Sequence, residues 1–469
     1  MDEIWQWGAV KTAAAIRNKD ISAKDAVAAA LLRMEKMNGS VNAVTVDLST
    51  EARKAADEAD AIQSTGVATG PLHGVPITIK ENVDQAGYST PNGIPDLDKI
   101  IANEDSPVVS NLRKAGAIII GRTNTPEFSY RWFTDNPLRG KTLNPWDHGI
   151  TPGGSSGGAS SSVALGIGAM GHGNDLGGSL RYPAYACGVA TIRPSMGRVP
   201  AYNPTATEER PPMVQLMSVQ GPIAREVRDV RLSLEAMIQP DPRDPWHTAA
   251  PLDGPHLDGP IKVALTKTPA GVSCHPTVAK AVDEAGHLLA AAGYEVELID
   301  PPLVAEIAEA WRSLLMTDTQ VMSETAMRAM GSEDFIRVLD GYLAASNARD
   351  LDGQTRAFAD RTRLLRAWSV FMERYPLVVA PVSQTPPFPQ DADQQGNDRI
   401  REMLDEQSML YAINLLGLPS AAVPLGITDG IPTGVQIIGR RFREDTCLDA
   451  AQIIENTVGV LAHQLWARE

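Results

Sequence analysis

The stretch Thr151-Pro152-Gly153-Gly154-Ser155-Ser156-Gly157-Gly158 is the most informative part of this sequence. It runs directly into residues 159–169, where small residues follow a helical pattern, so we expect a glycine-rich entrance to a helix. Such an entrance exposes backbone N–H groups that suit an anion or a developing negative charge. The stretch therefore predicts a functional loop, whereas a flexible linker would not lead into a helix.

Two other motifs rich in glycine and serine do not fit this loop. A phosphate loop needs G-x-x-x-x-G-K-[ST], which is absent. Ser155 and Ser156 each match G-x-S-x-G, but the elbow of an α/β-hydrolase needs a strand directly before the serine. The preceding residues, Asn144-Pro145-Trp146-Asp147-His148-Gly149, cannot form that strand. The pattern S-x-x-K does not occur in the chain, which also excludes the β-lactamase arrangement.

A second cluster follows, Asp175-Leu176-Gly177-Gly178-Ser179-Leu180-Arg181-Tyr182-Pro183-Ala184. Two adjacent glycines before a serine permit a tight turn whose N–H groups point into one hole, with the Ser179 hydroxyl at its edge. A nucleophile and an oxyanion hole in one turn are what acyl transfer requires. We expect Asp175 and Arg181 to form a buried ion pair that holds the turn; a direct catalytic role is the alternative.

Lys80 is the candidate base for a serine nucleophile. It ends the short apolar strand expected at residues 75–79, and burial lowers the pKa of a lysine, which makes it a usable base. The alternative is a lysine that reaches past the strand to water. His172, close in sequence to Ser179, is the rival base. None of the eight histidines pairs at i, i+4, so the sequence predicts no metal site of that kind. A serine nucleophile with a lysine base needs no metal or organic cofactor, and we expect none.

Helical patterns alternate with short apolar runs along the chain. We expect helices at 9–17, 23–37 (with Ser22 as its N-cap), 50–62, 106–115, 277–292 and 445–456, and strands at 75–79, 117–121, 262–265, 294–298, 377–380, 421–423 and 434–438. Proline-rich residues 200–212, 240–260 and 381–397 read as loops; the first two could instead be domain linkers. This rhythm predicts an α/β protein, a single large domain with a central mixed β-sheet covered by helices on both faces.

Composition and charge limit which partners the protein can bind and in which compartment we expect it. A formal net charge of -15 disfavours a nucleic acid ligand, because such a surface repels phosphates. The longest apolar stretches, such as 415–427, are too short to cross a membrane. Three widely spaced cysteines form no disulfide framework, and the acidic start Met1-Asp2-Glu3 is unlike a signal peptide. We therefore expect a cytoplasmic protein, with no nucleic acid and no membrane as partner.

Taken together, these features resemble the amidase signature family. The resemblance rests on five motifs and spans about residues 5 to 460, continuing through 414–439. The motifs are His73-Gly74-Val75-Pro76-Ile77-Thr78-Ile79-Lys80-Glu81-Asn82, Gly121-Arg122-Thr123-Asn124, Asn144-Pro145-Trp146-Asp147, the loop at 153–158, and the cluster from Asp175 to Ala184.

The resemblance implies a catalytic set and a domain plan. Ser179 matches the acylated nucleophile, Ser155 the serine that follows a cis peptide bond, and Lys80 a neutral lysine base. Leu176, Gly177, Gly178 and Ser179 match the turn that forms the oxyanion hole. Residues 1–469 would form one amidase signature domain, with a helical part at about 1–65, a catalytic core at about 70–235, and a C-terminal part at about 260–469 that completes the sheet and the substrate pocket.

The chain departs from the family pattern in three places. Arg193-Pro194-Ser195 replaces a common Lys-Pro-Thr, and Ala159-Ser160-Ser161-Ser162 follows the first loop. Between Thr125 and Asn136, aromatic residues stand where small residues are common, namely Phe128, Tyr130, Trp132 and Phe133. Core packing under the catalytic loop is one explanation. The other is an apolar substrate pocket that prefers an aryl or bulky acyl group.

The expected function is therefore hydrolysis of a small carboxamide through an acyl-enzyme on Ser179. The substrate would be a small amide-type molecule, and a homodimer is possible. Hydrazides and esters remain alternatives within the same mechanism. Two other classes of role are the glutaminase component of a glutamyl-tRNA amidotransferase, which would need a polar, charged pocket, and a non-catalytic binding protein that kept the fold.

Overall fold

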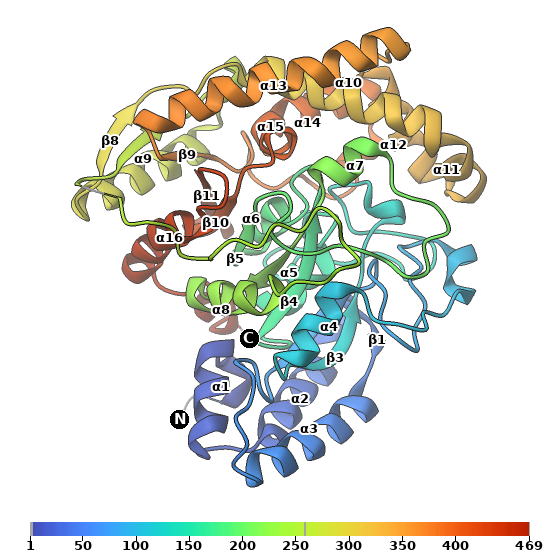
Figure 1. Ribbon diagram of the computed structural model, residues 1–469, viewed down its shortest axis with the longest axis vertical. Helices are drawn as coiled ribbons and strands as arrows, with labels where there is room; N and C mark the ends of the chain where they lie inside the picture. The colour runs from blue at the N-terminus through green and yellow to red at the C-terminus, as the bar shows by residue number, and fades with distance from the viewer. Residues whose placement is uncertain (1–2, 258, 469) are drawn as a thin grey trace.

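A single 11-stranded mixed sheet crosses the computed structural model, which describes residues 3–257 and 259–468 (Figure 1). The pairs β3–β2, β2–β4, β9–β7 and β7–β8 are parallel, and the other neighbouring pairs are antiparallel. In sheet order the strands are β1 (Val44–Asp47), β3 (Ile118–Thr123), β2 (Pro76–Lys80), β4 (Met170–Asp175), β6 (Val219–Ala224), β5 (Ala190–Arg193), β10 (Ser420–Thr428), β11 (Ile431–Gly439), β9 (Leu377–Pro381), β7 (Lys262–Leu265) and β8 (Glu295–Leu298).

Helices pack on both faces of the sheet, because strand side chains alternate between one apolar core on one face and two on the other. In β2, Ile77 and Ile79 enter one core, which α1 (Ala9–Asn18), α4 (Pro107–Lys114), α8 (Val227–Met237), α9 (Pro276–Ala291) and α16 (Glu444–Val458) cover. The opposite face is covered by α2 (Ala23–Val41), α3 (Ser49–Ser64), α5 (Gly157–Ala164), α6 (Arg181–Cys187), α7 (Pro212–Met217), α10 (Val304–Met322), α12 (Glu333–Ala344), α13 (Leu351–Arg374), α14 (Asn397–Glu406), α15 (Ser408–Leu416) and α17 (Ala462–Trp466). Helix α11 (Glu324–Met330) extends from α10 at the edge of the molecule (Figure 1).

The predicted α/β class, with a mixed sheet covered on both faces, is confirmed. The predicted helices and strands named above are all present, with ends that differ by a few residues. Ser22 caps α2, because its hydroxyl accepts the Asp25 N–H at 3.0 Å. The division into three parts of one domain stays a prediction, although strands from the second and third parts share one sheet with β1.

The expectation of a helix at 159–169 needs correction, and the strand that follows it was not predicted. The helix expected at 159–169 ends at Ala164, because Gly166 and Gly168 take left-handed backbone conformations with φ of 81° and 75°. Strand β4 then begins at Met170, a position that no apolar run marks, since the strand reads Met-Gly-His-Gly-Asn-Asp. The close approach of its neighbours explains the glycines, because an added Cβ at Gly173 would lie 2.7 Å from the Ser156 hydroxyl oxygen.

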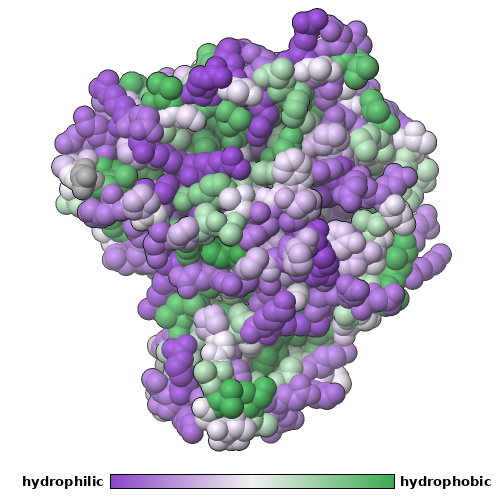
Figure 2. All heavy atoms as spheres, in the orientation of Figure 1, coloured by the Kyte–Doolittle hydropathy of each residue, from purple (hydrophilic) through white to green (hydrophobic). Residues whose placement is uncertain are grey.

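The face in Figure 2 is largely hydrophilic, with separate apolar patches. Within residues 3–257 and 259–468, no helix has both the length and the apolar character to cross a bilayer.

Candidate active site

Parallel pairing of β2 and β4 brings the two sequence clusters to one edge of the sheet. Ile77 pairs with Met170 and Thr78 with Gly171, so both strands end on the same side. Ends of neighbouring parallel strands are where open α/β sheets bind ligands. Lys80 closes β2, and the turn that contains Ser179 follows β4 directly. Helix α5 begins beside them, immediately after Ser155 and Ser156.

Lys80 is fully buried and its amino group has three polar neighbours. Its Nζ lies 2.7 Å from Ser155 Oγ, 3.2 Å from Ser156 Oγ and 2.7 Å from Asn174 Oδ1. The side-chain oxygen of Asn174, Oδ1, can only accept a hydrogen bond, so one N–H of the Lys80 amine points there. Burial lowers the pKa of Lys80 well below its ordinary value, although the nearby Asp175 carboxylate opposes that shift. A neutral amine keeps a lone pair that can accept the Ser155 proton.

The first loop packs tightly behind Lys80, and the peptide bond between Gly154 and Ser155 is cis. A Cβ added at Gly154 would lie only 2.4 Å from the carbonyl oxygen of Arg131. Glycine is therefore required where the loop passes the aromatic segment. Thr134 strengthens this contact, because its hydroxyl donates to the Gly153 carbonyl at 2.9 Å.

The turn after β4 is organised by the Asp175 carboxylate. It accepts the Gly178 N–H at 2.8 Å and the Leu180 N–H at 3.2 Å. Gly178 has φ of 101°, which favours glycine. Because its N–H already bonds Asp175, Gly178 is not free to donate to a substrate. Within the described chain, the N–H groups of Leu176, Gly177 and Ser179 have no acceptor, and these three are the remaining candidate donors of the predicted oxyanion hole.

Asp175 and Arg181 form a fully buried ion pair, with Nε and Oδ2 3.1 Å apart. Arg193 lies nearby, 3.8 Å from the same carboxylate, and Asn414 donates to it at 2.8 Å. Burial alone would raise the pKa of Asp175, but Arg181, Arg193 and Asn414 together more than offset it and leave the pKa below its usual range. These contacts support the predicted structural role of Asp175 and Arg181.

Asp175→Asn is expected to destabilise the protein by about 3–5 kcal/mol, because it leaves two buried guanidinium groups without their counter-charge. Urea unfolding near neutral pH measures this loss. The depressed pKa means that the carboxylate contributes stability above about pH 4 and loses it as the pH falls further. Asp352→Asn is the control, since its pair with Arg356 is exposed and should contribute less than about 1 kcal/mol. Equal losses in both variants would contradict the prediction.

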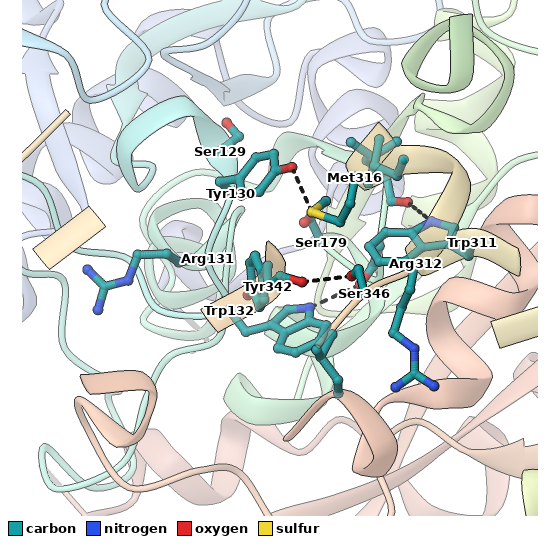
Figure 3. A pocket seen from close by; sticks show the side chains of 14 residues that line it. Ser129, Tyr130, Arg131, Trp132, Ser179, Trp311, Arg312, Met316, Tyr342 and Ser346 are labelled. Carbon is teal, nitrogen blue, oxygen red and sulfur yellow. Dashed lines mark hydrogen bonds between the residues drawn. The ribbon is translucent and has the colours of Figure 1, made fainter. Parts of the chain in front are cut away.

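Ser179, 8% exposed, lies in the wall of a mainly apolar cavity that opens to solvent (Figure 3). Two arginines also line the wall, and their guanidinium groups point away from it (Figure 3). Both are paired with carboxylates, Arg131 with Asp393 at 2.7 Å and Arg312 with Asp405 at 2.9 Å. The remaining wall is mainly aromatic and aliphatic. It comprises Tyr130, Trp132, Leu176, Gly177, Trp311, Leu315, Met316, Tyr342 and Leu404, with Ser129 and Ser346.

The four aromatic residues singled out in the sequence divide between cavity and core. Tyr130 and Trp132 line the cavity with Ser179 (Figure 3). Phe133 is 1% exposed and stacks on Phe388 with ring centroids 6.2 Å apart, so it does not reach the cavity. Phe128 contacts Phe335 and faces a separate hollow. Core packing and pocket lining, the two explanations offered for this segment, thus apply to different residues.

His172 is buried in β4 and bonds Gln220, with Nε2 and Oε1 2.8 Å apart. Burial lowers its pKa to about 3, so the ring is neutral near pH 7. Within the described residues, neither ring nitrogen bonds a serine. Lys80, which contacts Ser155 directly, is therefore the better placed base.

The described residues offer no candidate site for a metal ion. Residues 3–257 and 259–468 contain no group of three or more histidine, cysteine, aspartate or glutamate side chains that could hold an ion.

A family model described as Amidase matches residues 25–448, nearly the whole chain. The chain belongs to the amidase signature family. It is an amidase, and its fold is the amidase signature fold, as the resemblance predicted. Among solved structures, a bacterial aryl acylamidase of the same family superposes with a TM-score of 0.84 and 26% identity over 98% of this chain and 97% of that one.

Two curated relatives of this amidase differ in what their names say they do. An indoleacetamide hydrolase of Bradyrhizobium diazoefficiens is 53% identical over 99% of this chain and 88% of its own length. A component of the glutamyl-tRNA(Gln) amidotransferase of Moorella thermoacetica is 32% identical, covering 94% of each chain.

Several residues at the site were not predicted from the sequence. Asn174 directly precedes the Asp175 cluster, and its position at the end of β4 could have marked it as a neighbour of Lys80. Trp311, Met316, Tyr342 and Leu404 come from helices far along the chain, and no local motif distinguishes them.

Proposed function

We propose that this amidase hydrolyses the primary amide of an arylacetamide, with indole-3-acetamide as the candidate substrate. The observation that carries the proposal is the cavity beside Ser179, in which Tyr130, Trp132, Trp311 and Tyr342 supply aromatic wall. Burying an aromatic group of 150–250 Å² contributes roughly 4–6 kcal/mol at about 25 cal/mol per Å². The 53% identical indoleacetamide hydrolase supports the same acyl group.

The reaction proceeds by acyl transfer to Ser179. Neutral Lys80 takes a proton from Ser155, which takes one from Ser179, and the Ser179 oxygen attacks the amide carbonyl. Donors from Leu176, Gly177 and Ser179 stabilise the oxyanion. The proton returns through Ser155 to the leaving nitrogen, ammonia departs, and water hydrolyses the acyl-enzyme by the reverse relay. Release of the carboxylate restores the free serine.

The glutaminase role is the second candidate, because amidotransferase components match most of the chain. Glutamine carries an α-carboxylate and an α-ammonium group, which need charged partners when they leave water. The two arginines that line the cavity, Arg131 and Arg312, are already paired with carboxylates. An aryl group suits these walls better than a free amino acid does.

A substrate panel tests the proposal. With the purified protein, we expect kcat/KM for indole-3-acetamide to exceed the values for acetamide and for glutamine by at least about 100-fold, since the ring contributes binding energy only when it fills the cavity. Ammonia and indole-3-acetate are measured together, and the hydrazide and ethyl ester of indoleacetic acid report the leaving group. Preference for acetamide or glutamine would contradict the aryl proposal.

Tyr342→Ala tests the wall of the cavity. The variant should lower kcat/KM for indole-3-acetamide about 10- to 100-fold and change that for acetamide less than about threefold, because acetamide does not reach the ring. Tyr294→Ala is the matched control, since Tyr294 is half-buried against the core on the opposite face of the sheet. Equal losses for both substrates would assign Tyr342 a purely structural role.

The cytoplasmic location and a homodimer remain proposals. Cys187, Cys274 and Cys447 are free thiols, which suits a reducing compartment. Fractionation of the source cells tests the location, and light scattering after gel filtration measures the mass of the assembly.

A further inference from the structure

Two tryptophan side chains bond consecutive carbonyl groups of the turn before Ser179. Trp132 Nε1 donates to the Gly177 carbonyl oxygen at 3.0 Å, and Trp311 Nε1 donates to the Leu176 carbonyl oxygen at 3.2 Å. Trp132 lies between η3 (Glu127–Ser129) and the first loop, whereas Trp311 lies in α10. Figure 3 shows both rings beside Ser179. The same turn is therefore held from two distant parts of the chain.

These bonds fix the direction of two N–H groups. In a planar trans peptide the carbonyl and the following N–H point in opposite directions. Anchoring the Leu176 carbonyl on Trp311 thus aims the Gly177 N–H away from that ring, and anchoring the Gly177 carbonyl on Trp132 aims the Gly178 N–H away from the other. The Gly178 N–H meets Asp175 at 2.8 Å. The Gly177 N–H has no acceptor among the described residues and is free for the substrate.

The rings have little freedom to move. Both are largely buried, and Trp311 stacks on Tyr411 of α15 with centroids 4.7 Å apart. A Cβ at Gly177 would lie 2.9 Å from Trp311 Cζ2, so the ring also lies directly against the turn. An oxyanion hole is effective because its donors are oriented before the reaction begins. The Trp311 bond orients the Gly177 N–H in this way, and the Trp132 bond holds the next peptide of the same turn, whose N–H bonds Asp175.

We propose that Trp132 and Trp311 are positioning residues, which hold the oxyanion turn through their indole N–H groups in addition to lining the acyl cavity. The inference rests on the proposed acyl transfer at Ser179 and deepens it. It assigns to these two rings an effect on the chemical step that Tyr342, which lines the same cavity, does not have. Loss of the N–H groups should therefore impair all amides alike, including those too small to touch the rings.

Trp311→Phe and Trp132→Phe remove the donors and keep an aromatic ring. We expect each to lower kcat about 10- to 100-fold for both indole-3-acetamide and acetamide, somewhat less than the loss of a direct oxyanion donor. The inhibition constant of a benzyl trifluoromethyl ketone, whose adduct places an oxyanion in the turn, should rise by the same factor. The dissociation constant of indole-3-acetate, which forms no tetrahedral adduct, should change less than about threefold in comparison.

Trp368→Phe is the matched control. Its indole donates to the Pro302 carbonyl at 2.8 Å, remote from the cavity lining, so it removes a bond of the same kind without touching the turn. Melting temperatures verify that each variant folds. Should Phe at 311 unfold the protein, benzothienylalanine at 311 keeps the ring shape without the N–H. Unchanged kcat with a raised KM for the aryl amide alone would overturn the positioning role of the two tryptophans.

A fluorophosphonate probe separates this inference from the function on which it rests. Labelling of Ser179 in the parent protein, together with normal kcat in both Phe variants, would refute only the positioning role. Absence of labelling at Ser179 would refute the acyl-transfer mechanism itself.

Discussion

Ser179→Ala is expected to abolish hydrolysis of indole-3-acetamide, with a loss on the order of a millionfold in kcat, because no other hydroxyl can form the acyl-enzyme. The melting temperature should stay within a few degrees of the parent value, since the serine is at the edge of the cavity and its removal leaves no buried charge. Mass spectrometry should find a fluorophosphonate adduct on Ser179 in the parent and none in the variant. An adduct on any other residue would contradict the assignment.

A second variant, Ser155→Ala, tests the proposed proton relay. Ser155 contacts Lys80 at 2.7 Å and is proposed to relay a proton without bonding to carbon. The variant should therefore keep a measurable fraction of activity and still acquire the probe at Ser179, more slowly. Activity equal to that of the parent would eliminate Ser155 from the relay.

Lys80→Ala is expected to lower kcat/KM about 10²- to 10⁴-fold at neutral pH, the usual contribution of a positioned base. In the parent, activity should fall on the acid side as the lysine becomes protonated. Because burial moves the pKa of Lys80 well below its ordinary value, the neutral form persists to a lower pH than in an exposed lysine. In the variant this limb should disappear, and activity should rise toward alkaline pH as hydroxide substitutes for the base.

The rival base gives the opposite profile. If His172 were the base, Lys80→Ala would keep the acid limb of the parent, and His172→Gln would remove it. The bond from His172 to Gln220 predicts instead that His172→Gln keeps the parent pH profile.

Most helices and strands could be predicted from the sequence, because each is marked by a pattern within its own short segment. Strand β7 coincides with the predicted 262–265, and α2 begins at Ala23 after the predicted Ser22 cap. Strand β4 was missed because glycines replace the apolar residues that usually mark a strand. Those glycines serve close packing of α5 and the first loop against the sheet, which is a tertiary requirement.

The sequence by itself determined the chemistry that this protein can perform. The proposed catalytic residues, Lys80 at a strand end and Ser155 and Ser179 in glycine-rich turns, are recognisable because each needs a particular local backbone. Only the tertiary structure decided which side chains line the cavity and how its turn is held. Trp311 and Tyr342 reach the cavity from helices more than 130 residues after Ser179 along the chain. Such contacts depend on packing between distant elements, and packing leaves no periodic or local pattern that a sequence could display.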